Sequence, residues 1–377
     1  MRILINASNL HIGGGIQVAD SIIREIVNFP QYEYRVVVSA AVRKELGGWS
    51  GHRQIRIVEY TAKPKLSSVL SGRDAFLDRQ VKEFSPDAVF SVFGPTYWRP
   101  TVLHLCGFAI PHYLYTKRDT PFFSRLTFKQ RIRLMVMRWK KLRIMNRNAE
   151  AWVCETDDAT ERLQRLLPQK QVFTVSNSCN QIFEHPERWK PFSLPESSAI
   201  NFLAVSAYYP HKDLSILVKT AAWLRQYRPD FDFRFIVTVA PEILNVPEEL
   251  KAYVLCCGRV PLERLPSLYQ QADIVIHPSL LECFSATYLE AMKMKKTLLV
   301  TDLAFAKDVC GPAAAYYQAG NAVSLAGKML ELSRSPDICQ ALVQQGRNQQ
   351  KKFLSPTQRV HTYWQLLERL SSQHQNY

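Results

Sequence analysis

Short apolar segments rich in β-branched residues alternate with longer segments of helical periodicity along nearly the whole chain. Some of the short segments, such as Ile274, Val275 and Ile276, contain no polar residue, which is typical of parallel strands buried on both faces. Parallel strands must be joined by crossover connections, usually helices, so the alternation predicts an α/β fold. A chain of 377 residues is long enough for two such domains.

A proline-containing segment is the predicted domain boundary. Residues 184–198 have three prolines and no hydrophobic period, so we expect them to link an N-terminal domain (1–183) to a C-terminal domain (199–355). A final helix within 356–377 is predicted to pack back toward the N-terminal domain. Each domain is expected to be Rossmann-like, with a doubly wound parallel sheet facing a central cleft. The expected strands lie near residues 2–7, 34–40, 55–60, 87–93, 101–107, 151–155, 173–176, 201–206, 233–239, 253–257, 273–277, 297–301 and 314–317.

Positive charge is concentrated in one segment. The chain has 48 Lys and Arg against 33 Asp and Glu, a net charge of +15, and residues 117–147 alone hold 11 bases and one acid. No apolar run approaches the ~18 residues that span a bilayer, and the first apolar run is too short for a secretory signal. Eight cysteines without a C-x-x-C pair suggest a reduced, cytoplasmic protein.

Three consecutive glycines follow the first expected strand and precede a helical pattern. Such glycines let the backbone approach a ligand closely, and the next helix start offers free N–H groups to an anion. We therefore predict that Gly14 and Gly15 contact a bound donor. The pattern is not G-x-G-x-x-G, and a simple tight turn is the alternative.

The segment 277–292 combines two carboxylates with a helix start. A buried strand ends at His277, Glu282 follows in a loop, and Glu290 lies inside the next helix. The amides of Ser285, Ala286 and Thr287 open that helix and favour a phosphate oxygen. Two carboxylates that accept hydroxyl hydrogen bonds, with phosphate between them, suit a sugar nucleotide. The alternative is a loop acid and a solvated helix glutamate.

This segment resembles the retaining GT-B glycosyltransferases of family 4, in which Glu-x7-Glu follows a strand ending in Pro-Ser and precedes Ala-Met. Residues 175–177, 205–214 and 258–273 resemble other segments of that family in the same order, so the resemblance covers nearly the whole chain. It implies the GT-B fold, with Glu290 holding ribose hydroxyls and Glu282 contacting the donor sugar. Lys212 would neutralise the leaving diphosphate.

The resemblance also implies an activity. We expect a retaining hexosyltransferase (EC 2.4) that moves a sugar from a nucleoside-diphosphate sugar to a saccharide, lipid-linked, in bacterial O-antigen, capsule or exopolysaccharide synthesis. No protein nucleophile is expected, because the diphosphate itself can take the acceptor proton. This chain has Ser206 and Ala207 where the family commonly has Gly-Arg, and Arg259 is the predicted replacement for the missing cation.

Two histidines of the first domain are further candidates. His104, placed at the end of an apolar strand, is predicted to handle a proton, and His112 to lie on the acceptor side; a structural role is the alternative for both. Asp230 and Asp232 form Asp-x-Asp but are expected in a surface turn. No cluster has zinc spacing, so neither a metal nor another cofactor is expected.

The basic segment 123–147 is predicted to be an amphipathic helix. Its apolar stripe has Trp139 near one edge, and an adjacent sector holds Lys129, Arg133 and Lys140. This pattern predicts peripheral contact with the inner face of the cell membrane, on the acceptor side. Packing on its own domain and a polyanion site are the alternatives. The apolar stripe comprises Phe128, Ile132, Met135, Trp139 and Leu142.

Two other functions remain open from the sequence. A phosphorylase or sugar-nucleotide hydrolase would share the fold and the donor site. A nucleic-acid-binding protein would use the basic residues of 117–147, but the segment lacks the Gly-aromatic pattern of an RNA-recognition strand, so no nucleic acid is expected.

Overall fold

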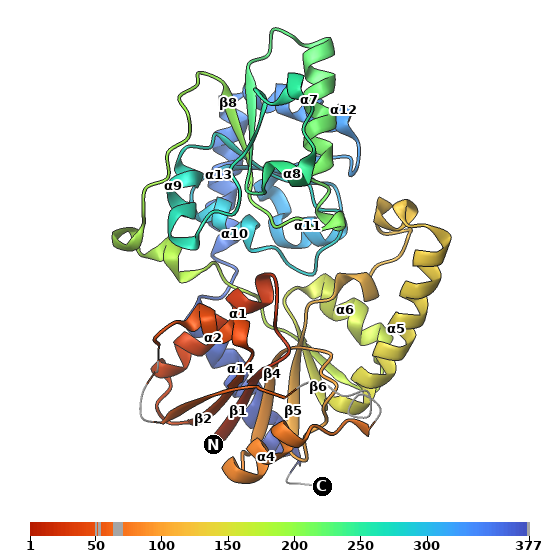
Figure 1. The fold of residues 1–377 in the computed structure, drawn as a ribbon, viewed down its shortest axis with the longest axis vertical. Coiled ribbons are helices and arrows are strands. Elements are labelled where there is room, and N and C mark those ends of the chain that lie inside the picture. The colour runs from red at the N-terminus through yellow and green to blue at the C-terminus, as the bar shows by residue number, and fades with distance from the viewer. Residues whose placement is uncertain (50, 52–53, 63–70, 375–377) are drawn as a thin grey trace. The chain divides into compact units, whose positions relative to one another are not determined.

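The computed structural model describes residues 1–49, 51, 54–62 and 71–374 (Figure 1). The chain forms two compact units. Unit 1 comprises Met1–Leu114, Phe128–Ser178 and the chain from Leu354 onward, and unit 2 comprises Tyr115–Thr127 and Cys179–Phe353.

Unit 1 contains a seven-stranded sheet in the order β3-β2-β1-β4-β5-β6-β7, and all of its pairings are parallel. The order reverses between β1 and β4, as in doubly wound folds. Its described elements are β1 (Arg2–Ala7), α1 (Gly14–Glu25), β2 (Glu33–Val38), α2 (Ala40–Leu46), β3 (Ile55–Glu59), α4 (Ala75–Phe84), β4 (Ala88–Gly94), β5 (Leu103–Phe108), α5 (Phe128–Asn148), β6 (Ala151–Cys154), α6 (Asp157–Leu166), β7 (Gln171–Thr174) and α14 (Pro356–His374).

Unit 2 contains a six-stranded parallel sheet in the order β10-β9-β8-β11-β12-β13. Here the order reverses between β8 and β11. Its described elements are the 3₁₀ helix η3 (Pro121–Arg125), β8 (Ile200–Ala204), the 3₁₀ helix η6 (Pro210–Lys212), α7 (Ser215–Tyr227), β9 (Phe233–Val237), α8 (Pro241–Leu244), β10 (Val254–Cys256), α9 (Leu265–Gln270), β11 (Ile274–His277), α10 (Ala286–Lys293), β12 (Thr297–Thr301), α11 (Ala304–Cys310), β13 (Ala314–Tyr317), α12 (Ala322–Ser333) and α13 (Pro336–Gln350).

The predicted α/β class is confirmed, and every predicted strand is present with its ends shifted by two residues at most. The apolar runs located the strands because the central ones are buried on both faces; Ile3, Leu4 and Ile5 of β1, for example, have no exposed surface.

The final helix α14 lies against the sheet of unit 1, although the rest of that unit ends at residue 178 (Figure 1). Trp364 is fully buried, and its ring centroid lies 5.8 Å from that of Phe90 on β4, edge to face. The side chains of α14 in this core are Val360, Tyr363, Trp364, Leu367 and Leu370.

The observed units differ from the predicted domains at residues 115–127 and 179–183, which were assigned to the N-terminal domain but belong to unit 2. The predicted linker, 184–198, also belongs to unit 2, and residues 354–355 belong to unit 1. The predicted basic helix also begins later, at Phe128, because residues 121–125 form a 3₁₀ helix and Leu126 adopts an extended conformation. Across the described parts of the chain, no helix has both the length and the apolar character required to cross a bilayer.

Candidate functional site

The most clearly defined polar cluster lies at the topological switch point of unit 2. β8 and β11 are hydrogen-bonded neighbours, but β9 lies beyond β8 and β12 lies beyond β11. The connections that leave the carboxyl ends of β8 and β11 therefore diverge, which opens the kind of crevice where α/β sheets bind ligands. The first connection carries Lys212 and the second carries Glu282.

The partly buried Lys212 and the buried Glu282 and His277 form a polar cluster. The Lys212 ammonium is paired with Glu282 Oε1, and His277 Nε2 lies 3.2 Å from the same oxygen. Burial alone would raise the pKa of Glu282, but the Lys212 charge and the His277 hydrogen bond together hold it well below its usual range. Burial lowers the pKa of His277, so the neutral ring donates its Nε2–H to an ionised carboxylate. The sequence prediction brought Lys212 and Glu282 to one site but gave His277 no role.

Glu290 forms a second polar contact in the same unit. Its Oε2 accepts a hydrogen bond of 2.8 Å from Tyr269 Oη, and both residues are buried. Burial raises the pKa of Glu290 to about 7, although the tyrosine hydrogen bond acts in the opposite direction. Glu290 is therefore not the solvated helix residue that was the alternative. The sequence gave Tyr269 no role beyond its place in the resembled segment 258–273.

The start of α10 reaches the end of β8. Ser285 is the N-cap, and Thr287 Oγ1 donates to the carbonyl of Val205 over 3.4 Å. The N–H of Tyr288 donates a hydrogen bond to the carbonyl of Ser285 at 3.2 Å. Helix geometry leaves the N–H groups before it, those of Ala286 and Thr287, for a ligand. These amides supply partial positive charge beside the switch point.

The other predicted donor residues are Arg259 in unit 2 and Gly14 and Gly15 in unit 1. Arg259 is exposed and follows β10, the edge strand, which is separated from β8 by β9. Gly14 and Gly15 form the first turn of α1 in unit 1, after Gly13 at φ 76°. A Cβ at Gly14 would meet nothing within 4 Å, whereas one at Gly15 would lie 3.4 Å from Leu10. Only Gly14 therefore borders open space.

The acceptor-side candidates all lie in unit 1. His112 is part of the 3₁₀ helix Pro111–Tyr113 and is half-buried. Lys129, Arg133 and Lys140 are exposed on α5. This long helix buries only Met145 and Asn148, both near its end.

The predicted position of His104 is wrong. It is the second residue of β5, at the amino end of the strand, and its ring is buried. Nδ1 lies 2.6 Å from the Asn148 carbonyl and must donate to it, so Nε2 accepts from Ser91 Oγ at 2.8 Å. Burial lowers the pKa of His104 to about 4. Because both nitrogens are engaged, we assign His104 a structural role in this network.

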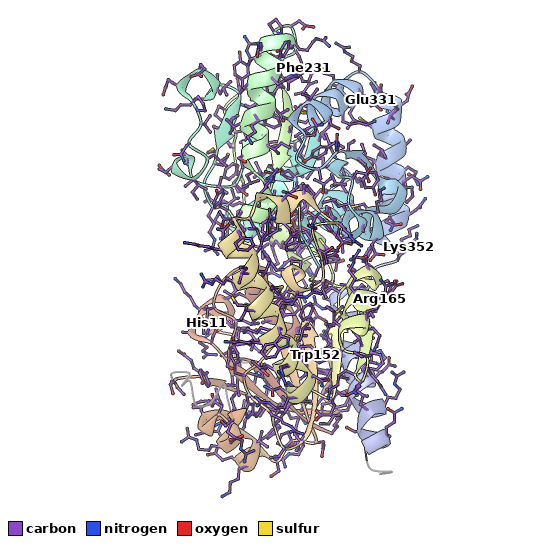
Figure 2. The ribbon with its side chains drawn as sticks, turned by 90° about the vertical axis from the view of Figure 1, so that its right-hand side faces the viewer. His11, Trp152, Arg165, Phe231, Glu331 and Lys352 are labelled. Carbon is purple, nitrogen blue, oxygen red and sulfur yellow. The ribbon has the colours of Figure 1, made fainter. Side chains whose placement is uncertain are left out.

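Asp-x-Asp is in an exposed turn, as expected. Asp230 pairs with Arg228 at 3.1 Å, and Asp232 directly precedes β9, at the amino edge of the sheet. Phe231 between them marks the uppermost part of unit 2 in Figure 2. This edge is opposite to the one that carries Lys212 and Glu282. Over the described residues, no group of three His, Cys, Asp or Glu side chains is placed to hold a metal ion.

The structure is similar over its full length to solved glycosyltransferases. A glycosyltransferase from Rickettsia africae matches with a TM-score of 0.71 and 16% identity over 98% of both chains. A sucrose-phosphate synthase from Thermosynechococcus elongatus matches with a TM-score of 0.71 and 14% identity over 99% of both chains. HepE from Anabaena, solved with UDP-glucose, matches with a TM-score of 0.67 and 13% identity over 99% of this chain and 100% of that one.

The two parallel sheets have the arrangement of the GT-B fold. Residues 199–335, within unit 2, match the family described as Glycosyl transferases group 1, which is consistent with the family 4 resemblance. No curated protein sequence matches the chain.

Protonation of Glu290 should be visible in the pH dependence of stability. Its pKa is raised from 4.5 to about 7 in the folded protein, so between these values the folded state holds a proton that the unfolded state has lost. Stability therefore falls as pH rises through this window, by about 3 kcal/mol from this group. We expect Glu290→Gln to lose this fall when urea unfolding is measured from pH 4.5 to 7.5.

The comparison is between the wild type and the variant, because the lowered pKa of His277 makes stability depend on pH with the opposite sign. Glu331→Gln, an exposed change on α12, is the control for loss of one carboxylate. Parallel pH profiles for wild type and Glu290→Gln would contradict the raised pKa.

Proposed function

We propose that the protein is a retaining, metal-independent glycosyltransferase that uses a nucleoside-diphosphate sugar as donor and a lipid-linked saccharide as acceptor. The observation that supports a donor of this class is the largely buried Lys212–Glu282 pair beside the start of α10. HepE, a neighbour in fold, was solved with UDP and with UDP-glucose, which supports a donor of this class.

In this proposal the diphosphate lies against Lys212 and the amides of Ala286 and Thr287. Negative charge builds on the diphosphate as the glycosidic bond breaks, so a fixed ammonium and fixed N–H groups stabilise the transition state more than the bound donor. Glu282 keeps Lys212 in place before the donor arrives, and His277 holds Glu282 in turn. The carboxylate of Glu282 then contacts hydroxyls of the transferred sugar.

Glu290 binds the ribose in the same proposal. A carboxylate accepts hydrogen bonds from two adjacent hydroxyls, whereas a protonated carboxyl offers one good acceptor. Tyr269 fixes one oxygen of Glu290 and leaves the other for the donor. Donor binding should therefore favour the ionised form and lower the pKa of Glu290.

Retention of configuration rests on the family resemblance, with the diphosphate taking the proton of the acceptor hydroxyl.

The surface of α5 supports the proposal of a lipid-linked acceptor. Its exposed side chains combine large apolar groups with bases, which suits an interface of anionic lipid. The apolar ones are Phe128, Ile132, Met135, Val136, Met137 and Trp139, with exposed fractions from 39% to 76%.

Such a helix would hold the enzyme at the inner face of the cell membrane, where a polyprenyl-diphosphate carrier presents its sugar. WaaG, a glycosyltransferase involved in lipopolysaccharide biosynthesis, is another neighbour in fold, with a TM-score of 0.65 and 14% identity. This likeness supports a role in the assembly of a bacterial surface polysaccharide.

Replacing Lys212 tests the donor site. We expect Lys212→Ala to lower kcat for sugar transfer by about 100-fold, because a charge aimed at the leaving group is lost. The measurement is release of nucleoside diphosphate from a panel of UDP-, GDP- and dTDP-sugars, with and without acceptor. Lys219→Ala, an exposed change on α7, is the control. A folded Lys212→Ala enzyme at full rate would exclude this site, and release independent of acceptor would indicate a hydrolase.

The same assay in excess EDTA tests metal independence. Lys212 and the helix amides supply the positive charge that a divalent cation supplies in other transferases. We therefore expect kcat in EDTA to equal kcat with added Mg²⁺ or Mn²⁺ within about twofold. Removal of an essential Lewis acid, which contributes several kcal/mol to transition-state stabilisation, would lower kcat by a far larger factor. Loss of turnover in EDTA that Mg²⁺ restores would contradict the proposal.

Charge reversal on α5 tests the membrane proposal. Each base near an anionic surface contributes about 1 kcal/mol, so changing Lys129, Arg133 and Lys140 to Glu should weaken vesicle binding by 100-fold or more. Binding is measured by co-sedimentation with phosphatidylglycerol vesicles, and with phosphatidylcholine vesicles for comparison.

The control triple variant makes the same charge change at exposed positions outside α5: Arg165, Lys219 and Lys352. Equal losses in the two triple variants would contradict a specific role for α5. Wild-type binding to duplex DNA with none to vesicles would favour the polyanion alternative.

A further inference from the structure

The segment 115–127 contacts both loops of the proposed donor site. Thr120 Oγ1 donates to the carbonyl of Leu280, in the loop that leads to Glu282, over 2.5 Å. The ring of Phe122 meets that of His211, next to Lys212, edge to face at 6.3 Å. These contacts lie within unit 2, to which the segment belongs although the chain on either side belongs to unit 1.

Arg125 makes the strongest contact of the segment. Its two terminal nitrogens bind the two carboxylate oxygens of Asp213, Nη1 to Oδ1 at 2.5 Å and Nη2 to Oδ2 at 3.0 Å. Asp213 is buried, with 2% of its side chain exposed, whereas 40% of the Arg125 side chain is exposed. A bidentate pair of this kind fixes direction as well as distance.

Asp213 is the residue after Lys212 and has an unusual backbone conformation. Its φ of 49° and ψ of 33° lie in the left-handed region, which few residues other than glycine adopt without support. This turn ends the 3₁₀ helix η6, whose last residue is Lys212. A contact that fixes Asp213 therefore fixes the end of the turn that carries Lys212.

The two loops are also joined to each other. Leu280 N–H donates to His211 O at 2.7 Å, and Ser279 Oγ donates to the same carbonyl at 3.2 Å. The space around Arg125 is closed on another side, since a Cβ on Gly320 would lie 2.8 Å from its Nη2. The guanidinium of Arg125 is thus held by Asp213 on one side and bordered by Gly320 on another.

We propose that Arg125 is a positioning residue that acts through Asp213 to hold Lys212 toward the diphosphate of the donor. The inference rests on the proposed function, because it assumes that Lys212 binds the diphosphate. In this proposal Arg125 acts on Asp213 and not on phosphate, and Asp213→Asn distinguishes the two roles.

Three variants test this proposal: Arg125→Gln, Asp213→Asn and the double variant. Asn tolerates the left-handed conformation, and the double variant leaves no buried carboxylate unpaired, so a folded protein is available even if Arg125→Gln alone unfolds. The readout is the Kd, by calorimetry, of UDP, GDP, ADP and dTDP and of the matching monophosphates.

We expect all three variants to bind the diphosphate about 10-fold more weakly than the wild type, with the effects non-additive, while binding of the monophosphate stays unchanged. Arg125→Lys, which keeps the charge but not the bidentate geometry, should recover part of the loss. Arg228→Gln, which removes the exposed pair with Asp230 in the same unit, is the matched control and should bind as the wild type does.

Equal losses for diphosphate and monophosphate would show a merely structural role and overturn the proposal. So would a loss in Arg125→Gln that Asp213→Asn lacks, because Arg125 would then act directly on phosphate. Full diphosphate affinity in all three variants would overturn it while leaving the proposed function intact. A wild type that binds none of the nucleotides would instead remove the proposed function, and this inference with it.

Discussion

The largely buried pair of Lys212 and Glu282 is the interaction on which the proposed chemistry depends. Removing an ammonium and a carboxylate from water costs several kcal/mol per ion, and the cost is offset only when each charge has a partner of good geometry. Here the partners come from the ends of two neighbouring strands, β8 and β11. The reversal of strand order at this point is what lets both loops reach one place and still leaves room beyond the sheet edge.

The surroundings of Glu282 and Glu290 shift the pKa values of these two carboxylates in opposite directions. Glu282 has a cation and a hydrogen-bond donor beside it, so it stays ionised despite burial. Glu290 has only the neutral Tyr269 hydroxyl, so burial dominates and its pKa rises to about 7. The permanent charge of Glu282 suits its proposed role in orienting Lys212. Glu290 has a pKa near neutral pH, which suits a residue whose carboxylate would gain hydrogen bonds from a bound ligand.

Sequence periodicity predicted the strands well because burial on both faces requires continuous apolar runs, as in β11. The sequence singled out Lys212 and Glu282, which follow strands, and Glu290, which lies within a helix, because their spacing resembles that of a known family. Tyr269 and His277 were missed because their roles depend on how deeply the fold buries them. His104 was misplaced for a similar reason: the apolar run does not show that the strand begins at Leu103, or that Ser91 and Asn148 occupy the histidine ring.

The basic segment also shows why charge counted along a sequence overstates the charge on a surface. Of the 11 bases in residues 117–147, Arg125 is neutralised by Asp213, Lys141 contacts the ring of Tyr97 with its pKa lowered by burial, and Arg147 donates to Asn148. Arg125 lies three residues before Phe128, where α5 begins. The segment that appears in the sequence as one basic patch is therefore divided between the units: Arg125 is paired within unit 2, whereas the exposed bases of α5 belong to unit 1.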